Sequence, residues 1–199
     1  MGLTIDQGRD IVGYARAVIE GHFSGKKPKP PESLKADFGQ KRGVFVTLHD
    51  NGDLRGCIGY PEPTLPLGIA VERAALSAAT EDPRFPQVQE QEMGHIVVEV
   101  SVLTAPQLVE VSEPGDYPMK IVIGRDGLIA ELGWGRGLLL PQVPVEWNWE
   151  PLEFLRHTCS KAGLPLDAWK EKGFKLYSFS AQVFSEEGPM GEVTERKIS

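Results

Sequence analysis

A short β-hairpin is the feature that most restricts the fold of this 199-residue chain. Two alternating segments, 44–49 and 54–59, flank the turn residues Asp50-Asn51-Gly52. A two-residue Asn-Gly turn would mix polar and apolar side chains on each face of the hairpin. A three-residue loop that pairs His49 with Asp53 keeps them apart. We therefore expect the three-residue loop, with Gly52 in the left-handed conformation.

This register gives the hairpin one apolar face and one mixed face. The apolar face carries Val44, Val46, Leu48, Leu54, Gly56 and Ile58. The mixed face carries Phe45, Thr47, His49, Arg55, Cys57 and Gly59. Because side chains alternate along a strand, the mixed face is where chemistry would be placed while the other face packs.

Helices and strands follow one another along the whole chain. Thr4 and Gln7 form a capping box before an amphipathic helix that we expect to end near Gly21. Residues 24–42 read as an extended surface connection. Further helices are expected at 64–79 and 151–162, and further strands at 95–104, 120–124, 128–132, 137–140 and 174–184.

The order of these elements predicts an α+β fold with mostly antiparallel sheets and packed helices. A hairpin, a helix and a strand occur twice in succession, which suggests an internal duplication that gives two lobes. We expect one domain over residues 1–184. Residues 185–199 are polar and read as a C-terminal tail.

Composition narrows the class of partner. The chain carries 28 acidic residues against 21 Lys and Arg, a net charge of −7, which disfavours nucleic acid and anionic membranes as partners. No apolar run reaches the roughly 18 residues of a membrane span, and the first residues show no signal peptide. Two cysteines cannot build a disulfide framework, so we expect a cytoplasmic protein.

Cys57 is the first candidate for chemistry. Arg55 lies two residues before it on the same strand, and a nearby guanidinium favours the nucleophilic thiolate. Gly56 and Gly59 leave space around the thiol for a ligand or another backbone. Three roles stay open for Cys57: a buried structural residue, a ligand contact or a nucleophile.

Glu99 and Arg84 are the other candidates. Glu99 interrupts a run of valines, so it lies either on a solvent face or beside Arg55 on a neighbouring strand, as an ion pair or general base. Arg84 lies in the stiff segment Pro83-Arg84-Phe85-Pro86 and either faces a ligand or bonds to backbone. The four histidines and two cysteines show no metal-ligand spacing, so no metal site is predicted.

Several segments together resemble the AMMECR domain family, in its prokaryotic stand-alone form. They are Gly43 to Leu48, Gly52 to Gly59 with the hexapeptide Leu54-Arg55-Gly56-Cys57-Ile58-Gly59, Asp82-Pro83-Arg84-Phe85, Glu99 to Leu103, Leu138 to Val143 and Lys161 to Leu164. The resemblance implies an α+β fold with a larger and a smaller lobe. It implies no reaction and no cofactor, and it associates the family with Memo-like and radical-SAM proteins as pathway partners.

Two functions from different classes follow. The first is an enzyme or small-ligand-binding protein whose site contains Cys57, Arg55 and Glu99, with Arg84, Thr47, Gly56 and Gly59 as ligand contacts. The second is a non-catalytic interaction domain whose hexapeptide hairpin binds a Memo-like or radical-SAM partner. A concave pocket containing Arg55 and Cys57 would favour the first, and a flat apolar patch over the same strands would favour the second.

Overall fold

The computed structural model describes residues 2–32 and 39–197. The chain forms two compact units: a first unit of Met1–Leu103 with Gln182–Lys197, and a second unit that begins at Thr104 and ends at Ala181. Each unit has its own hydrophobic core. The α+β architecture with antiparallel pairing is as the sequence predicts. No helix in the described ranges is long and apolar enough to cross a membrane.

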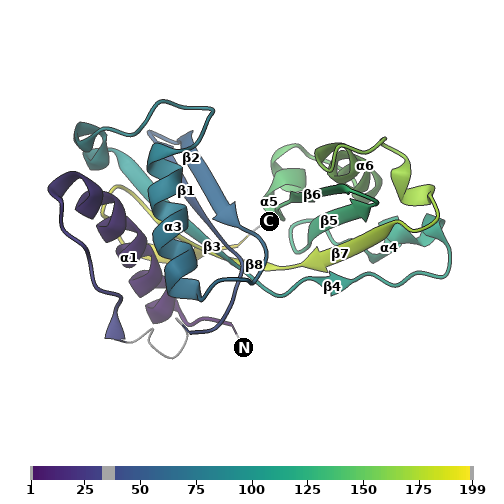
Figure 1. Cartoon of the computed structure of the whole chain (residues 1–199), viewed down its shortest axis with the longest axis horizontal. Coiled ribbons are helices and arrows are strands. Elements are labelled where there is room, and N and C mark those ends of the chain that lie inside the picture. Colours follow the sequence, from purple (N-terminus) through teal and green to yellow (C-terminus); the bar gives the residue numbers. More distant parts are fainter. Residues whose placement is uncertain (1, 33–38, 198–199) are drawn as a thin grey trace. The chain divides into compact units, whose positions relative to one another are not determined.

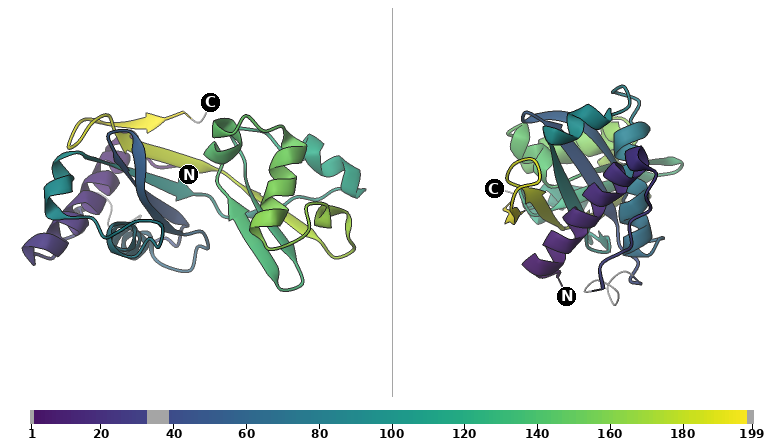
Figure 2. Two further views of the ribbon diagram at one scale, coloured as in Figure 1. Left: turned by 90° about the horizontal axis from the view of Figure 1, so that it is seen from above. Right: turned by 90° about the vertical axis from the view of Figure 1, so that its left-hand side faces the viewer.

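The first unit is a five-stranded sheet with two long helices. The strand order is β2-β1-β3-β8-β9. The strands are β1 (Val44–Asp50), β2 (Asp53–Tyr60), β3 (Ile96–Leu103), β8 (Ala181–Glu186) and β9 (Val193–Arg196). Helices α1 (Ile5–Ser24) and α3 (Leu67–Thr80) lie side by side against one face of this sheet (Figures 1 and 2). Val46, Val98 and Val100 point into the resulting core and are fully buried.

The N-terminal helix begins as the sequence predicts. Thr4 and Gln7 form the expected capping box. The helix runs past Gly21 to Ser24 and is closed by Gly25, whose φ of 69° is the left-handed conformation that glycine accommodates. Part of the predicted connection over 24–42 falls on residues 33–38, which lie outside the described ranges.

The turn of the first hairpin corrects the sequence prediction. Asp50 pairs with Asp53, so the loop has two residues, Asn51 and Gly52, with φ values of 51° and 92°. The register shifts between Leu48 and His49, which leaves Arg55 as an extra residue in β2. This bulge restores the parity that the three-residue loop was expected to provide. The two faces beyond it are therefore as predicted.

Leu54 is the exception to the predicted faces. It lies between the turn and the bulge and pairs with His49 rather than with an apolar residue. Its exposed fraction is 39%, so it does not join the core. The sequence prediction was wrong here because the bulge changes the alternation after Leu54.

The predicted C-terminal tail is also wrong. Strand β8 continues through Glu186, and β9 pairs with it. Arg16 of α1 donates from Nε and Nη2 to the two Glu186 oxygens, both at 2.6 Å. A segment that looks polar in sequence is thus held in the first unit by a buried ion pair and strand pairing.

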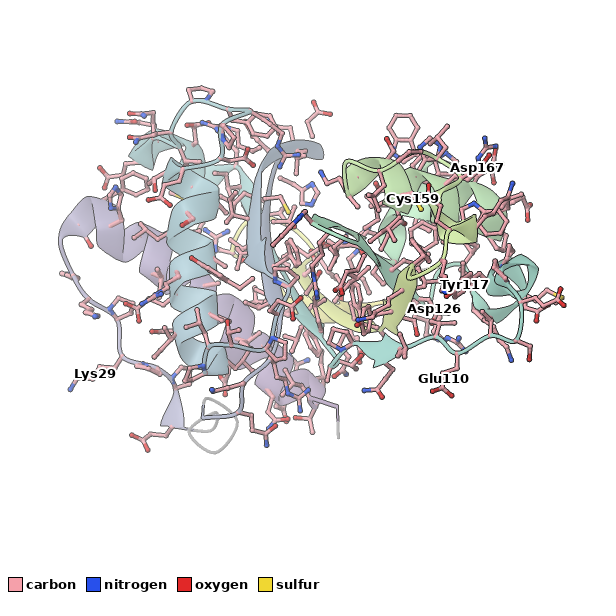
Figure 3. All side chains as sticks on the ribbon, turned by 45° about the vertical axis from the view of Figure 1, so that its right-hand side comes forward. Lys29, Glu110, Tyr117, Asp126, Cys159 and Asp167 are labelled. Carbon is pink, nitrogen blue, oxygen red and sulfur yellow. The ribbon has the colours of Figure 1, made fainter. Side chains whose placement is uncertain are left out.

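The second unit is a four-stranded sheet with one long helix on it. The strand order is β4-β7-β5-β6. The elements are β4 (Gln107–Leu108), α4 (Tyr117–Lys120), β5 (Gly127–Leu132), β6 (Gly135–Leu139), α5 (Gln142–Glu146), α6 (Pro151–Lys161) and β7 (Lys175–Phe179). Figure 3 shows Cys159 on α6, where it is fully buried among core residues that include Phe154 and Leu155.

Two strand predictions in this half fail. Residues 121–124 form no strand, because Asp126 accepts the Val122 N–H at 2.8 Å and Gly124 turns with a φ of 79°. The hairpin instead joins β5 and β6 through Gly133 and Trp134. The single strand expected over 174–184 is divided into β7 and β8, which belong to different sheets.

Both units contain a hairpin, a helix and a third strand that pairs with the first strand of the hairpin. We call β1–β2, α3 and β3 the first repeat, and β5–β6, α6 and β7 the second repeat. In each, the third strand pairs antiparallel with the first. The topology supports the duplication expected from the sequence.

Candidate functional site

The candidate site is a row of three side chains across the first sheet. Thr47 on β1 pairs with Cys57 on β2 and with Glu99 on β3. The Thr47 hydroxyl donates to the Cys57 sulfur at 3.3 Å. We call Cys57, Thr47 and Glu99 the polar row. It lies on the sheet face away from the helix-packed valines, as the sequence predicts for all three residues.

Glu99 lies at the far end of the polar row from Cys57. It is 5% exposed, and Arg196 of β9 donates to its Oε2 at 2.7 Å. Ser101, two residues further along β3, is 1% exposed and its hydroxyl has no hydrogen-bond partner. Ser101 was missed from the sequence, although its alternation with Glu99 places it on the same face. Arg196 was missed because its segment was taken as a tail.

Arg55 does not join Glu99, which corrects the sequence prediction. Strand β1 lies between their strands. Arg55 donates from Nε and Nη2 to Glu92 at 2.7 and 3.1 Å, and from Nη1 to the Pro86 carbonyl at 2.8 Å. Glu92 lies in a short 3-10 helix, Glu90–Gly94. Arg55 therefore ties the bulge to the chain segment before β3 and is not part of the polar row.

Asp82 and Arg84 border the other end of the row, at the edge strand β2. The Asp82 Oδ2 accepts the Cys57 backbone N–H at 2.8 Å. Arg84 donates from Nη2 to the same oxygen at 2.7 Å and to the Cys57 carbonyl at 3.4 Å. Arg84 thus lies near Cys57, as expected. Asp82 was not singled out from the sequence, although it belongs to the Asp82-Pro83-Arg84-Phe85 motif.

The two glycines of the hexapeptide do not open space for a ligand. A Cβ on Gly56 would lie 2.2 Å from the Ala78 carbonyl oxygen of α3, on the packed side of the sheet. A Cβ on Gly59 would lie 2.4 Å from the Phe45 ring. Both glycines are required by close packing within the first unit. Of the two alternatives that the sequence leaves open, the structure shows the approach of another backbone and not space for a ligand.

The electrostatics of Cys57 differ from those expected. Burial raises the pKa of the Cys57 thiol above its ordinary value. The Thr47 hydrogen bond and the Arg84 charge reduce that rise, whereas the charges of Asp82 and Glu99 add to it. Arg55 is not among the groups that act on the Cys57 thiol, so the expected influence of Arg55 is wrong. The cation that lowers the pKa of Cys57 is Arg84.

The second repeat contains an equivalent row made of different residues. Gly137 corresponds to Gly56, because a Cβ on Gly137 would also lie 2.2 Å from helix backbone, at Ala162. The next residue, Leu138, pairs with Ile129, which pairs with Tyr177 of β7. The fold thus accepts two aliphatic residues and an aromatic ring where the first repeat has a thiol, a hydroxyl and a carboxylate.

The second unit carries a surface hollow that does not involve the predicted side chains. A surface hollow of about 520 Å³ in the second unit is lined by Glu110, Val111, Ser112, Asp116, Met119 and Lys120. Figure 3 labels Glu110 at this location, and no predicted site residue lines the hollow. Within the described residues, no group of three or more His, Cys, Asp or Glu side chains is placed to hold a metal ion.

Comparison with known proteins gives the family. A model of the AMMECR1 family matches residues 12–184. Protein MJ0810 of Methanocaldococcus jannaschii is 57% identical over 198 residues, which covers 98% of both chains. A protein of Methanothermobacter thermautotrophicus is 55% identical over 187 residues and covers 94% of this chain and 97% of its own.

A solved structure shares the fold. The crystal structure of the uncharacterized protein PH0010 from Pyrococcus horikoshii matches with a TM-score of 0.90 and 48% identity, over 96% of this chain and 97% of that one. The family match extends over both repeats and includes every residue of the polar row. The chain belongs to the AMMECR1 family.

Proposed function

We propose that the first unit binds a small polar molecule on the sheet face that carries the polar row. The Ser101 hydroxyl is the observation that carries this proposal. It is buried and unpartnered beside Glu99. A buried hydroxyl without a partner costs about 1–3 kcal/mol, and a bound molecule that donates or accepts a hydrogen bond removes that cost.

The comparison between the repeats supports the same proposal. The second repeat has the same strand pairing with Leu138, Ile129 and Tyr177 in the row. The polar residues of the first repeat are therefore not a requirement of the fold. The polar side chains paired with Cys57 argue against the flat apolar patch that an interaction domain would present there.

The state of the thiol indicates the role of Cys57. A thiol whose pKa is raised by burial is a poor nucleophile at neutral pH. Cys57 then contacts the ligand as a soft, uncharged group. Thr47 and Ser101 supply hydroxyls, and Glu99 supplies a carboxylate whose charge is balanced by Arg196. The ligand class that fits is a small uncharged molecule with hydrogen-bond donors for Glu99.

Native mass spectrometry of the protein purified from the organism that makes it tests this function. We expect a bound mass on the wild-type chain that is released on denaturation. Glu99→Gln and Ser101→Val should lose it, because they remove an acceptor and fill the space at the hydroxyl. Ser160→Ala, an exposed position on α6, is the control and should keep the mass.

Two outcomes contradict the proposal. One is the absence of a bound mass on correctly folded wild-type protein. The other is a mass that the wild-type and both row variants carry equally. The pathway partners expected from the family resemblance, a Memo-like or radical-SAM protein, stay a prediction.

A further inference from the structure

Asp82 makes more contacts than a surface loop residue requires. Its side chain is 3% exposed, and it follows α3 directly. Oδ1 accepts the Arg84 backbone N–H at 3.1 Å and the Arg84 Nε at 3.0 Å. Oδ2 accepts the Cys57 N–H at 2.8 Å and the Arg84 Nη2 at 2.7 Å. Four hydrogen bonds use the full acceptor capacity of a carboxylate.

These contacts replace a neighbouring strand at one peptide. Cys57 lies in β2, the edge strand of the sheet. Asp82 accepts its N–H, and Arg84 donates to its carbonyl oxygen. Pro83, between the two, fixes φ and shortens the loop. The second repeat has Gly163 and Leu164 after α6, so it offers no carboxylate or guanidinium there.

We infer that Asp82 is a positioning residue for the candidate site: it anchors the Cys57 peptide in β2 and holds the Arg84 guanidinium beside the Cys57 thiol. This inference rests on the proposed function and extends it. A ligand on the polar row would contact the Cys57 thiol, and Asp82 controls the position of that thiol and the charges around it.

The electrostatic consequence has a definite sign. The charged groups that act on Cys57 are Arg84, Asp82 and Glu99, and Arg84 acts more strongly than Asp82. If Asp82 holds Arg84 in place, loss of the Asp82 charge releases Arg84 into solvent, and the net effect is a higher pKa for Cys57. If Asp82 acts only as a nearby negative charge, its loss lowers the pKa of Cys57.

The test is the pH profile of Cys57 alkylation by iodoacetamide, read by peptide mass spectrometry without any ligand. Asp82→Asn keeps the shape and an acceptor for the Cys57 N–H but removes the charge. We expect its apparent pKa for Cys57 to rise and its alkylation rate at pH 8 to fall several-fold, as in Arg84→Gln. The double variant should match Asp82→Asn alone, because Arg84 acts on Cys57 only while Asp82 holds it there.

A lower or unchanged apparent pKa in Asp82→Asn overturns the inference. Cys159 is the internal control, because it is fully buried and reacts only if the chain unfolds. If Cys159 reacts in Asp82→Asn, that variant has unfolded, and the Arg84→Gln variant is the test. An unchanged pH profile of Cys57 alkylation in Arg84→Gln also overturns the inference. Alkylation of Cys57 needs no bound molecule. The absence of a ligand would therefore contradict the proposed function without affecting this test.

Discussion

The two repeats share a topology and differ in one row of side chains and one extra residue. Residues 48–51 of the first repeat and 130–133 of the second occupy equivalent positions in the two hairpins. After the turn, three residues separate Gly52 from Gly56, whereas two residues separate Trp134 from Gly137. That extra residue is Arg55, the bulge.

The bulge and the polar row occur together in the first repeat. Bulges are common beside functional sites, where they redirect a strand. Here the bulge lies two residues before Cys57 and is held by Glu92. In the second repeat the hairpin is regular, the row is Leu138, Ile129 and Tyr177, and Arg136 pairs across the hairpin with Glu131. The scaffold therefore tolerates an apolar row, and this difference between the repeats supports the proposal that the polar row binds a ligand.

The largest expected effect is a loss of stability when a side chain is added at the glycine that each repeat packs against helix backbone. Gly56→Ala and Gly137→Ala each place a Cβ 2.2 Å from helix backbone, so each should lower the free energy of unfolding by roughly 2–4 kcal/mol. Urea unfolding measures both. Gly13→Ala is the matched control, because its Cβ meets nothing within 4 Å, and it should stabilise α1 by about 0.5–1 kcal/mol. A Gly56 or Gly137 variant as stable as wild type would break the equivalence.

The next effect separates the two arginines that directly precede these glycines, Arg55 and Arg136. The Arg55 side chain is 14% exposed and makes three hydrogen bonds, whereas Arg136 is 44% exposed. Arg55→Gln should cost about 1.5–3 kcal/mol, because Glu92 loses a charged partner at the bulge. Arg136→Gln should change stability by about 0.5 kcal/mol or less. Equal costs in urea unfolding would show that the bulge does not distinguish the repeats.

The smallest effect is the acid sensitivity that Asp82 gives to the first repeat. The hydrogen bonds from Arg84 lower the pKa of Asp82 from 3.8 to about 2. A depressed carboxyl pKa stabilises the folded state above the unfolded pKa, and that stability is lost as the pH falls toward 2. After screening at the half-exposed Arg84, the contribution is about 1–2 kcal/mol.

Urea unfolding between pH 6 and pH 2 measures this contribution. Wild type should exceed Asp82→Asn in stability above pH 5, and the difference should shrink as the pH approaches 2. A difference that does not change with pH would mean that the Asp82 carboxyl has no depressed pKa in the folded chain.

The sequence predicted those parts of the fold that follow from local pattern. The capping box at Thr4, the valine alternation around Glu99 and the helix before Gly163 are all present. Patterns of this kind depend on residues a few positions apart, which a single sequence displays directly. Thr47 and Cys57 share the face that the hydrophobic alternation predicted, although a bulge and not a three-residue loop provides the parity, and Glu99 faces away from the core as expected.

The failures involve contacts between residues far apart in the chain. Arg55 was paired with Glu99, but strand order separates them, and Glu92 and Arg196 are the actual partners. The bulge could not be read because alternation before and after it supports a three-residue loop equally well. The tail was misread because Glu186 is buried against Arg16, 170 residues earlier, and against the backbone of Val98.

Crystals of protein purified from the organism that makes it, solved at high resolution, would show whether a molecule occupies the polar row. We expect non-protein electron density there, with one atom within hydrogen-bonding distance of the Ser101 hydroxyl and another in contact with Cys57. We expect no such density on the Leu138–Ile129–Tyr177 row. A polar row that contacts only ordered water, with the bound molecule elsewhere on the chain, would contradict this expectation.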